Sequence, residues 1–183
     1  MAEGEIRSPV ILVGMHRSGT TLLTRMLERA GVFVGWRLPD NQEASFFRRH
    51  NDWLLHSSGG SWDAPKSMRY LYADADGVEA AVEYLRYRLS TFPCLEFLGP
   101  VRYLRYRSVF NVREPWAWKD PRNTVTLPLW TRLFPGARIV HIVRNGVDVA
   151  ESLYRRQKEG SQAARQEFAR YRFLFRFLAK RAW

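Results

Sequence analysis

Residues able to bind an anion are concentrated in one short stretch, from Gly14 to Thr21. The apolar run Val10 to Val13 precedes this stretch, and a helical pattern of apolar residues begins at Thr20. A buried strand that leads through a glycine-flanked loop into a helix points consecutive backbone N–H groups at a phosphate. We expect the anion to contact the side chain of Arg17, the hydroxyls of Thr20 and Thr21, and the backbone N–H groups of Ser18, Gly19, Thr20 and Thr21.

The loop has the spacing of a Walker A motif but not its lysine. Four residues separate Gly14 from Gly19, and Thr20 stands where the lysine belongs. The basic residue lies three places earlier, at Arg17. Without the lysine, a P-loop kinase or triphosphatase loses its charge on the β- and γ-phosphates. The loop therefore predicts a phosphate site and disfavours ATP hydrolysis.

Two further basic residues lie at the carboxyl ends of predicted strands. Lys119 ends the strand predicted at residues 116–119, and Arg144 follows the strand predicted at residues 137–143, which we interpret as buried. In parallel sheets, ligands bind beyond the carboxyl ends of the strands. We therefore expect Arg17, Lys119 and Arg144 to face one crevice.

The elements that must position these residues alternate between strands and helices. Strands are predicted at residues 6–14, 32–34, 116–119 and 137–143, and helices at 20–30, 43–57, 77–90, 124–134 and 147–157. This order predicts an α/β fold with three layers, α/β/α, around a mostly parallel sheet. In the first helix we expect the core side to carry Leu22, Leu23, Met26, Leu27 and Ala30.

The composition is that of one globular domain with a strongly basic surface. The 183 residues are 46% hydrophobic and carry a net charge of +11, which favours anionic partners. No recognised nucleic-acid motif accompanies this charge, so we expect no nucleic-acid partner. The single cysteine, Cys94, excludes an intrachain disulfide and a cysteine-based metal site. No apolar run is long enough to span a membrane and the first residues are acidic, so we expect a cytoplasmic protein.

Three stretches, in this order along the chain, resemble motifs of the PAPS-dependent sulfotransferases. Residues Gly14 to Thr21 resemble the family's 5′-phosphosulfate loop, and Trp118 to Arg122 are similar to its lysine-bearing strand end. Residues Arg138 to Ser152 resemble its 3′-phosphate motif, in which a strand ends in an arginine and a serine follows eight residues later. Arg144 and Ser152 have that spacing.

The resemblance implies transfer of the sulfuryl group from PAPS to a hydroxyl or amine, with PAP as the product and no metal. The 5′ loop, including Arg17, would bind the phosphosulfate. Arg144 would bind the 3′-phosphate bidentately, and Ser152 would donate a hydrogen bond to it. Lys119 would stabilise charge on the bridging oxygen.

The general base is less clearly marked. Cytosolic members have a histidine two places beyond the lysine, where this chain has Pro121. Other members use a glutamate after the first helix, and Glu43 is the best candidate, although it could instead be a helix-start carboxylate. His50 and Asp120 are lesser candidates. We interpret His50 as a core histidine, and Asp120 as the cap of a turn or a partner of Arg122.

The C-terminal part departs from the family pattern. We expect residues 1–183 to form a single sulfotransferase-like domain, shortened at its C-terminus, in which residues 158–183 form a basic, aromatic-rich helix. Its apolar residues cover more than one face, which suggests burial against the domain or a partner and makes a homo-oligomer plausible. A second interpretation therefore stays open: a truncated or degenerate relative that binds PAP, PAPS or another anionic partner without catalysis. Carbohydrate, lipid, peptide and small phenol all stay open as acceptors.

Overall fold

The computed structural model describes residues 6–159 and 161–162. The chain divides into two compact units, of which the first ends at Val143 and the second begins at Arg144.

A parallel sheet lies at the centre of the first unit. Its strands are β1 (Val10–Val13), β2 (Ala117–Lys119) and β3 (Arg138–His141), in the order β2-β1-β3. Both pairs are parallel, and the predicted strand at residues 32–34 is reduced to a parallel bridge between Phe33 and Trp116. Parallel pairing places the carboxyl ends of all three strands at one edge of the sheet.

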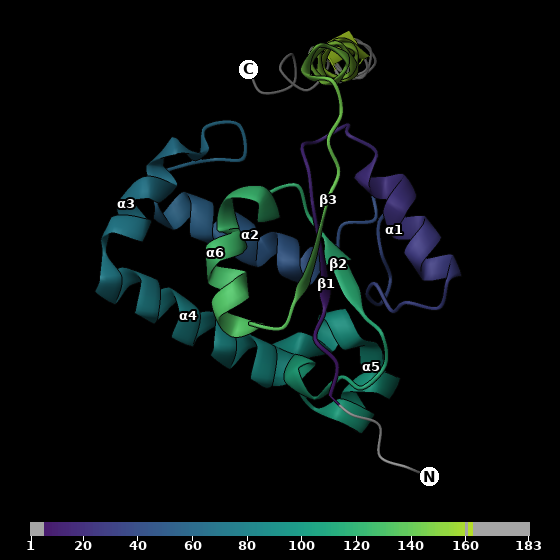
Figure 1. The fold of residues 1–183 in the computed structure, drawn as a ribbon, viewed down its shortest axis with the longest axis vertical. Helices are drawn as coiled ribbons and strands as arrows, with labels where there is room; N and C mark the ends of the chain where they lie inside the picture. Colours follow the sequence, from purple (N-terminus) through teal and green to yellow (C-terminus); the bar gives the residue numbers. More distant parts are fainter. Residues whose placement is uncertain (1–5, 160, 163–183) are drawn as a thin grey trace, which may run out of the picture. The chain divides into compact units, whose positions relative to one another are not determined.

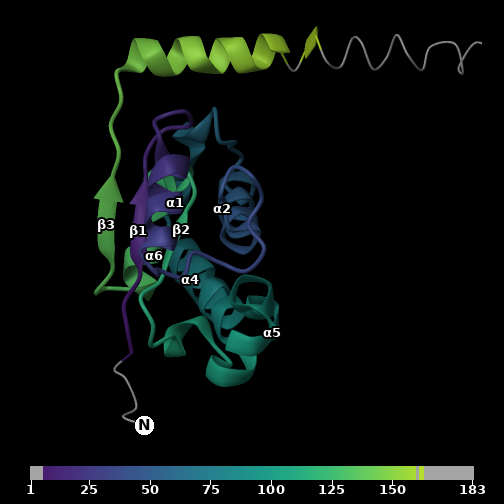
Figure 2. The ribbon, with the colours of Figure 1, turned by 90° about the vertical axis from the view of Figure 1, so that its right-hand side faces the viewer.

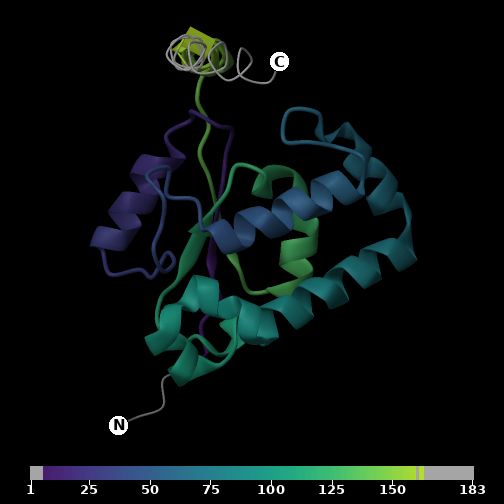
Figure 3. The same cartoon turned by 180° about the vertical axis from the view of Figure 1, so that it is seen from behind.

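Helices cover both faces of this sheet. They are α1 (Thr20–Arg29), α2 (Ser45–Ser57), α3 (Met68–Ala73), α4 (Ala75–Ser90), α5 (Leu95–Tyr106) and α6 (Asn123–Leu133). Helix α1 lies on one face and α6 on the other (Figures 1 and 2). Helices α2 and α4 both pack against α6, and the view from behind shows this arrangement (Figure 3). The unit is therefore the predicted three-layer α/β/α arrangement.

The core on the α2 and α6 side of the sheet is largely aromatic. Trp116 and Trp118 alternate along the chain, so their side chains share one face, and their ring centroids lie 5.6 Å apart. Phe47 of α2 stacks on Trp118 at 4.3 Å, and Trp130 of α6 meets Trp118 edge-on at 5.4 Å. This packing fixes α2 and α6 against the strand that ends in Lys119.

The predicted core face of α1 is only partly right: Leu23 and Leu27 are half-buried, but the other three residues are exposed. Leu22 is 66% exposed and Met26 is 58% exposed, whereas Thr20 and Thr24 are buried. The preceding loop sets the rotation of the helix: Thr20 points back at Gly14, where its methyl group lies 3.2 Å from the position a Cβ would occupy. Thr24, one turn later, donates to the carbonyl of Thr20 at 2.9 Å and stays on the same buried face.

The prediction that residues 137–143 form a buried strand is half right. The strand exists as β3, but all four of its residues are exposed. Among the described residues β3 pairs only with β1, so it is an edge strand. Its β-branched residues favour extended backbone whether or not they are covered, which is why the pattern predicted the strand but not its exposure.

In the second unit, residues 146–159 and 161–162 are helical, which agrees with the helix predicted at 147–157. The predicted helix at 158–183 lies almost entirely outside the described residues. Within the described ranges, no helix combines the length and the apolar character needed to cross a membrane.

Candidate functional site

The loop after β1 has a backbone that only certain residues tolerate. Gly14 has a φ of 151°, and a Cβ at this position would lie 2.8 Å from the carbonyl oxygen of Ile142. Arg17 and Gly19 both have left-handed backbone, with φ of 69° and 104°. The amide of Ser18 donates to the carbonyl of Met15 at 3.1 Å, which closes a turn. Ser18 therefore offers its hydroxyl to a ligand. Its backbone N–H was predicted to contact the anion, but in this structure it donates to Met15 instead.

The first turn of α1 has the features of an anion site. Its N-cap is Gly19, no side chain caps it, and no acidic residue lies in the turn. The backbone N–H groups of Thr20 and Thr21 have no acceptor among the described residues, as is usual for an uncapped helix start. The Ser18 hydroxyl is buried and also lacks a described partner. These donors fit a phosphate or sulfate group.

Lys119, at the carboxyl end of β2, meets this loop through a shared acceptor. The carbonyl oxygen of Asn41 accepts from the Lys119 Nζ at 2.5 Å and from the Thr21 Oγ1 at 3.1 Å. The loop and the lysine strand are adjacent because β1 and β2 are paired in parallel. Arg17 is exposed on the same loop. The structure thus brings the loop at residues 14–21 close to Lys119, whereas the prediction that Arg144 faces the same crevice stays a prediction.

Glu43 lies in this cluster as well. Its Oε1 is 3.3 Å from the Lys119 Nζ, and both side chains are buried, with 8% and 2% of their surface exposed. Helix α2 begins two residues later, at Ser45, and no side chain caps it. The carboxylate therefore pairs with Lys119 and makes no side-chain cap, although it still lies at the start of the helix, as the alternative interpretation has it.

Burial has a direct effect on Lys119. Desolvation lowers the pKa of its ammonium group below the ordinary value, and the negative charge of Glu43 partly opposes that shift. A buried lysine of this kind holds its proton less tightly than an exposed one. It is therefore suited to giving up a proton to a departing anion.

Arg122, which the sequence suggested only as a partner of Asp120, contacts three carboxylates. Its Nη1 lies 2.9 Å from Asp120 and 3.9 Å from the Glu43 Oε2, and its Nε lies 2.6 Å from Asp52. Asp120 also accepts from the Arg122 backbone N–H at 3.0 Å, so both proposed roles of Asp120 are confirmed. Burial raises the pKa of Asp120, while the adjacent Arg122 opposes the shift.

One buried amide, that of Asn51, connects this charged cluster to α6. It donates to the Asp120 Oδ2 at 3.0 Å and to the Asn123 Oδ1 at 2.8 Å. Its own oxygen accepts from the Thr126 hydroxyl at 2.7 Å and from the Trp130 indole at 2.8 Å. No sequence pattern singled out Asn51, because asparagine at a helical position has no chemical signature of its own.

His50 is the core histidine that the sequence predicted. It is 5% exposed, and its Nδ1 lies 2.6 Å from the carbonyl oxygen of Phe46. Burial lowers its pKa to about 4. The imidazole is therefore neutral near pH 7, and its Nδ1 is hydrogen-bonded to a carbonyl of its own helix.

The predicted 3′-phosphate residues belong to the second unit. The Arg144 Nε lies 3.6 Å from the Asp148 Oδ2, and the Asn145 side chain accepts from the Val147 N–H at 2.9 Å. Asn145 therefore caps the helix that carries Asp148 and Ser152. The roles of Arg144 and Ser152 in ligand binding stay predictions.

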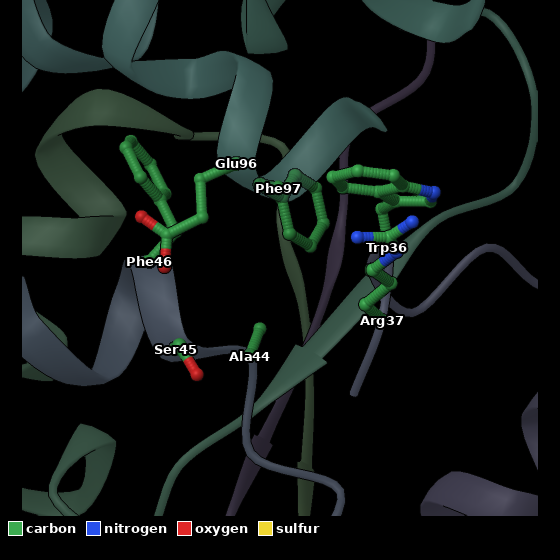
Figure 4. A pocket seen from close by; sticks show the side chains of 8 residues that line it. Trp36, Arg37, Ala44, Ser45, Phe46, Glu96 and Phe97 are labelled. Atoms are coloured by element: carbon green, nitrogen blue, oxygen red, sulfur yellow. The ribbon is translucent and has the colours of Figure 1, made fainter. Parts of the chain in front are cut away.

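A cavity of about 180 Å³ lies beside the first turn of α2, close in sequence to Glu43 (Figure 4). Arg37 stacks over the Trp36 ring at 4.3 Å. The lining consists of Gly35, Trp36, Arg37, Ala44, Ser45, Phe46, Glu96 and Phe97. A cavity of roughly 150 Å³ is known to hold one benzene ring, so this one has room for a single six-membered ring.

Comparison with known proteins agrees with this geometry. Searches of curated proteins and of solved structures gave no significant match. A family model described as the sulfotransferase family matches residues 9–181, which extends beyond the three motifs that carried the resemblance. Because that match covers nearly the whole sequence, the chain belongs to the sulfotransferase family.

Proposed function

We propose that this protein transfers a sulfuryl group from PAPS to a hydroxyl or amine of an acceptor. The observation that carries the proposal is the meeting of the phosphate loop, Lys119 and Glu43, in which Thr21 and Lys119 share the carbonyl of Asn41. Family membership supports sulfuryl transfer in general. The donor and the assignment of roles are our proposal.

The loop would hold the 5′ end of PAPS. The backbone N–H groups of Gly19, Thr20 and Thr21 and the hydroxyl of Ser18 would bind its oxygens, and Arg17 would supply positive charge. We assign the 3′-phosphate to Arg144 and Ser152 on their sequence spacing alone. PAPS, when bound, supplies the activated sulfuryl group.

Lys119 and Glu43 would handle charge and protons. Lys119 would stabilise the negative charge on the departing phosphate oxygen, and its lowered pKa favours donation of a proton there. Glu43 would accept the proton of the acceptor hydroxyl or amine. These two groups pair with each other in this structure, so Lys119 must leave Glu43 before either can act.

We further propose that the acceptor places a ring in the cavity between Trp36 and Phe46. The cavity has aromatic walls, a cation at Arg37, a carboxylate at Glu96 and a hydroxyl at Ser45, which suit a ring that carries polar groups. It adjoins the segment that carries Glu43. An acceptor held there would approach the carboxylate from the start of α2.

The second candidate function is nucleotide binding without catalysis. The observation that favours it is the Lys119–Glu43 pair itself, since a pair that does not open would keep both groups from reacting.

Transfer of radioactive sulfate from [³⁵S]PAPS would decide between the two functions. Suitable probes are 2-naphthol, glucosamine and 1-dodecanol, which represent phenols, amino sugars and fatty alcohols. We expect transfer by the wild-type chain, and a loss of about 10²-fold or more in Lys119→Met and in Glu43→Gln. Arg132→Met, which removes an exposed cation, is the control and should keep full activity. Binding of PAP with no transfer to any probe would favour the non-catalytic function.

A further inference from the structure

We propose that Arg122 is a positioning residue, which keeps the Glu43 carboxylate in place while Lys119 exchanges that carboxylate for the donor. This inference rests on the proposed function. Arg122 would act through Glu43 and would contact neither the donor nor the acceptor.

Lys119 and Arg122 hold different oxygens of Glu43. Lys119 lies 3.3 Å from the Oε1, and the Nη1 of Arg122 lies 3.9 Å from the Oε2. Departure of Lys119 therefore leaves the second oxygen still facing a positive charge. Without Arg122, Glu43 would have no counter-charge among the described residues once Lys119 had moved, and a buried carboxylate without one is strongly unfavourable.

The two cations differ in how firmly they are held. Within the described part of the chain, the Lys119 ammonium has one hydrogen bond besides that to Glu43, and it goes to the carbonyl of Asn41. Arg122 has two further carboxylates at its guanidinium: the Nη1 donates a hydrogen bond to Asp120 at 2.9 Å, and the Asp52 Oδ1 lies 2.6 Å from the Nε as an ion pair without hydrogen-bond geometry. A planar guanidinium that is hydrogen-bonded to one carboxylate and ion-paired with a second has little freedom to turn.

The groups that hold Arg122 are themselves fixed. Asp120 is fully buried and accepts both from Asn51 and from the backbone N–H of Arg122. Asn51 is in turn anchored on α6 through Asn123 and Thr126. Arg122 is thus the fixed partner of Glu43, and Lys119 is the exchangeable one.

The test measures PAP affinity by calorimetry, since PAP retains the phosphate oxygen that Lys119 would contact. The variant is Arg122→Lys, made both in the wild-type chain and in a Glu43→Gln chain. A lysine keeps the charge but cannot reach three carboxylates at once. Glu43 then has Lys119 as its main counter-charge, so it competes more strongly with the donor for the Lys119 ammonium. PAP affinity should therefore fall by about three- to tenfold.

The Glu43→Gln background separates positioning from folding. With no carboxylate to hold, Arg122→Lys should change PAP affinity there by less than about twofold. Arg132→Lys, at an exposed arginine of α6 paired with Glu79, is the matched control and should have no effect in either background. Arg122→Gln is a second variant, in case one of the two fails to fold, with the same expected contrast.

Each outcome has one meaning. A loss confined to the chain that retains Glu43 supports the positioning role. An equal loss in both backgrounds, or no loss in either, overturns it and leaves the proposed function standing. Absence of PAP binding by the wild-type chain overturns the proposed function, and this inference with it.

Discussion

The resting pair between Lys119 and Glu43 makes a prediction that needs no ligand. Both side chains are almost fully buried, so each charge depends on the other for compensation. Removing one partner of a buried pair usually costs about 3–5 kcal/mol. In Lys119→Met the remaining Glu43 keeps Arg122 at 3.9 Å, so we expect a cost near the lower end, about 3 kcal/mol. In Glu43→Gln the ammonium keeps the Asn41 carbonyl, the amide oxygen of the new glutamine and the negative charge of Asp120, so we expect a cost of about 3 kcal/mol there as well.

The double variant Lys119→Met/Glu43→Gln removes both charges and leaves no uncompensated ion. Its cost should be at least about 2 kcal/mol smaller than the sum of the two single costs. Urea unfolding at pH 7 measures all four free energies of unfolding, provided that the transitions are two-state. The control cycle is Arg132→Met with Glu79→Gln, an exposed pair whose coupling should be below about 1 kcal/mol. If the costs at Lys119 and Glu43 add to within about 0.5 kcal/mol, the buried pair does not exist in solution.

Four further predictions concern other parts of the molecule. Asn51→Leu should cost about 3 kcal/mol in urea unfolding, because Asp120 Oδ2 loses the hydrogen bond that it has within the described residues. The other groups bound to Asn51 each keep a second partner. Between pH 6.5 and pH 4 the wild-type chain should lose up to about 3 kcal/mol of stability that a His50→Leu chain does not lose. The reason is that the His50 pKa is about 4 in the folded state, so the folded state binds fewer protons than the unfolded state in that pH range. Gly14→Ala should cost about 1–3 kcal/mol and abolish detectable PAP binding, since the new methyl group would meet the carbonyl of Ile142. Arg37→Ala should raise the KM for the acceptor and leave PAP affinity unchanged in calorimetry, and an unchanged KM would remove the cavity from the acceptor site.

The fold was predictable where local pattern and tertiary position agree. The apolar run at Val10 to Val13 gives a central strand because both of its neighbours in the sheet pair with it. The alternation of Trp116 and Trp118 predicts their common face, which the 5.6 Å ring separation confirms. Periodicity failed for α1, where the turn at Gly19 sets the rotation of the helix and buries threonines in place of Leu22 and Met26.

The site was predictable only in part, for a physical reason. Loop residues and Lys119 are marked by their place after strands, and Glu43 is marked only by the resemblance, which points to a glutamate after the first helix. Residues that act through hydrogen bonds in three dimensions carry no such mark. Asn51 lies 69 residues from Asp120 in sequence, yet their side chains are 3.0 Å apart. Such pairs depend on how α2 packs over α6, which no local pattern encodes.

Calorimetric titration of the purified chain with PAP, with ATP and GTP as controls, tests whether the loop at residues 14–21 binds PAPS. We expect binding of PAP in the micromolar range, equivalent to about −8 kcal/mol, and little response to either triphosphate, because Thr20 replaces the lysine that triphosphates need. Binding of PAP should also weaken in Arg144→Ala by about 1.5–3 kcal/mol, the contribution expected of a charged hydrogen bond. Failure to bind PAP, or equal binding of ATP, would contradict the assignment of the loop to PAPS.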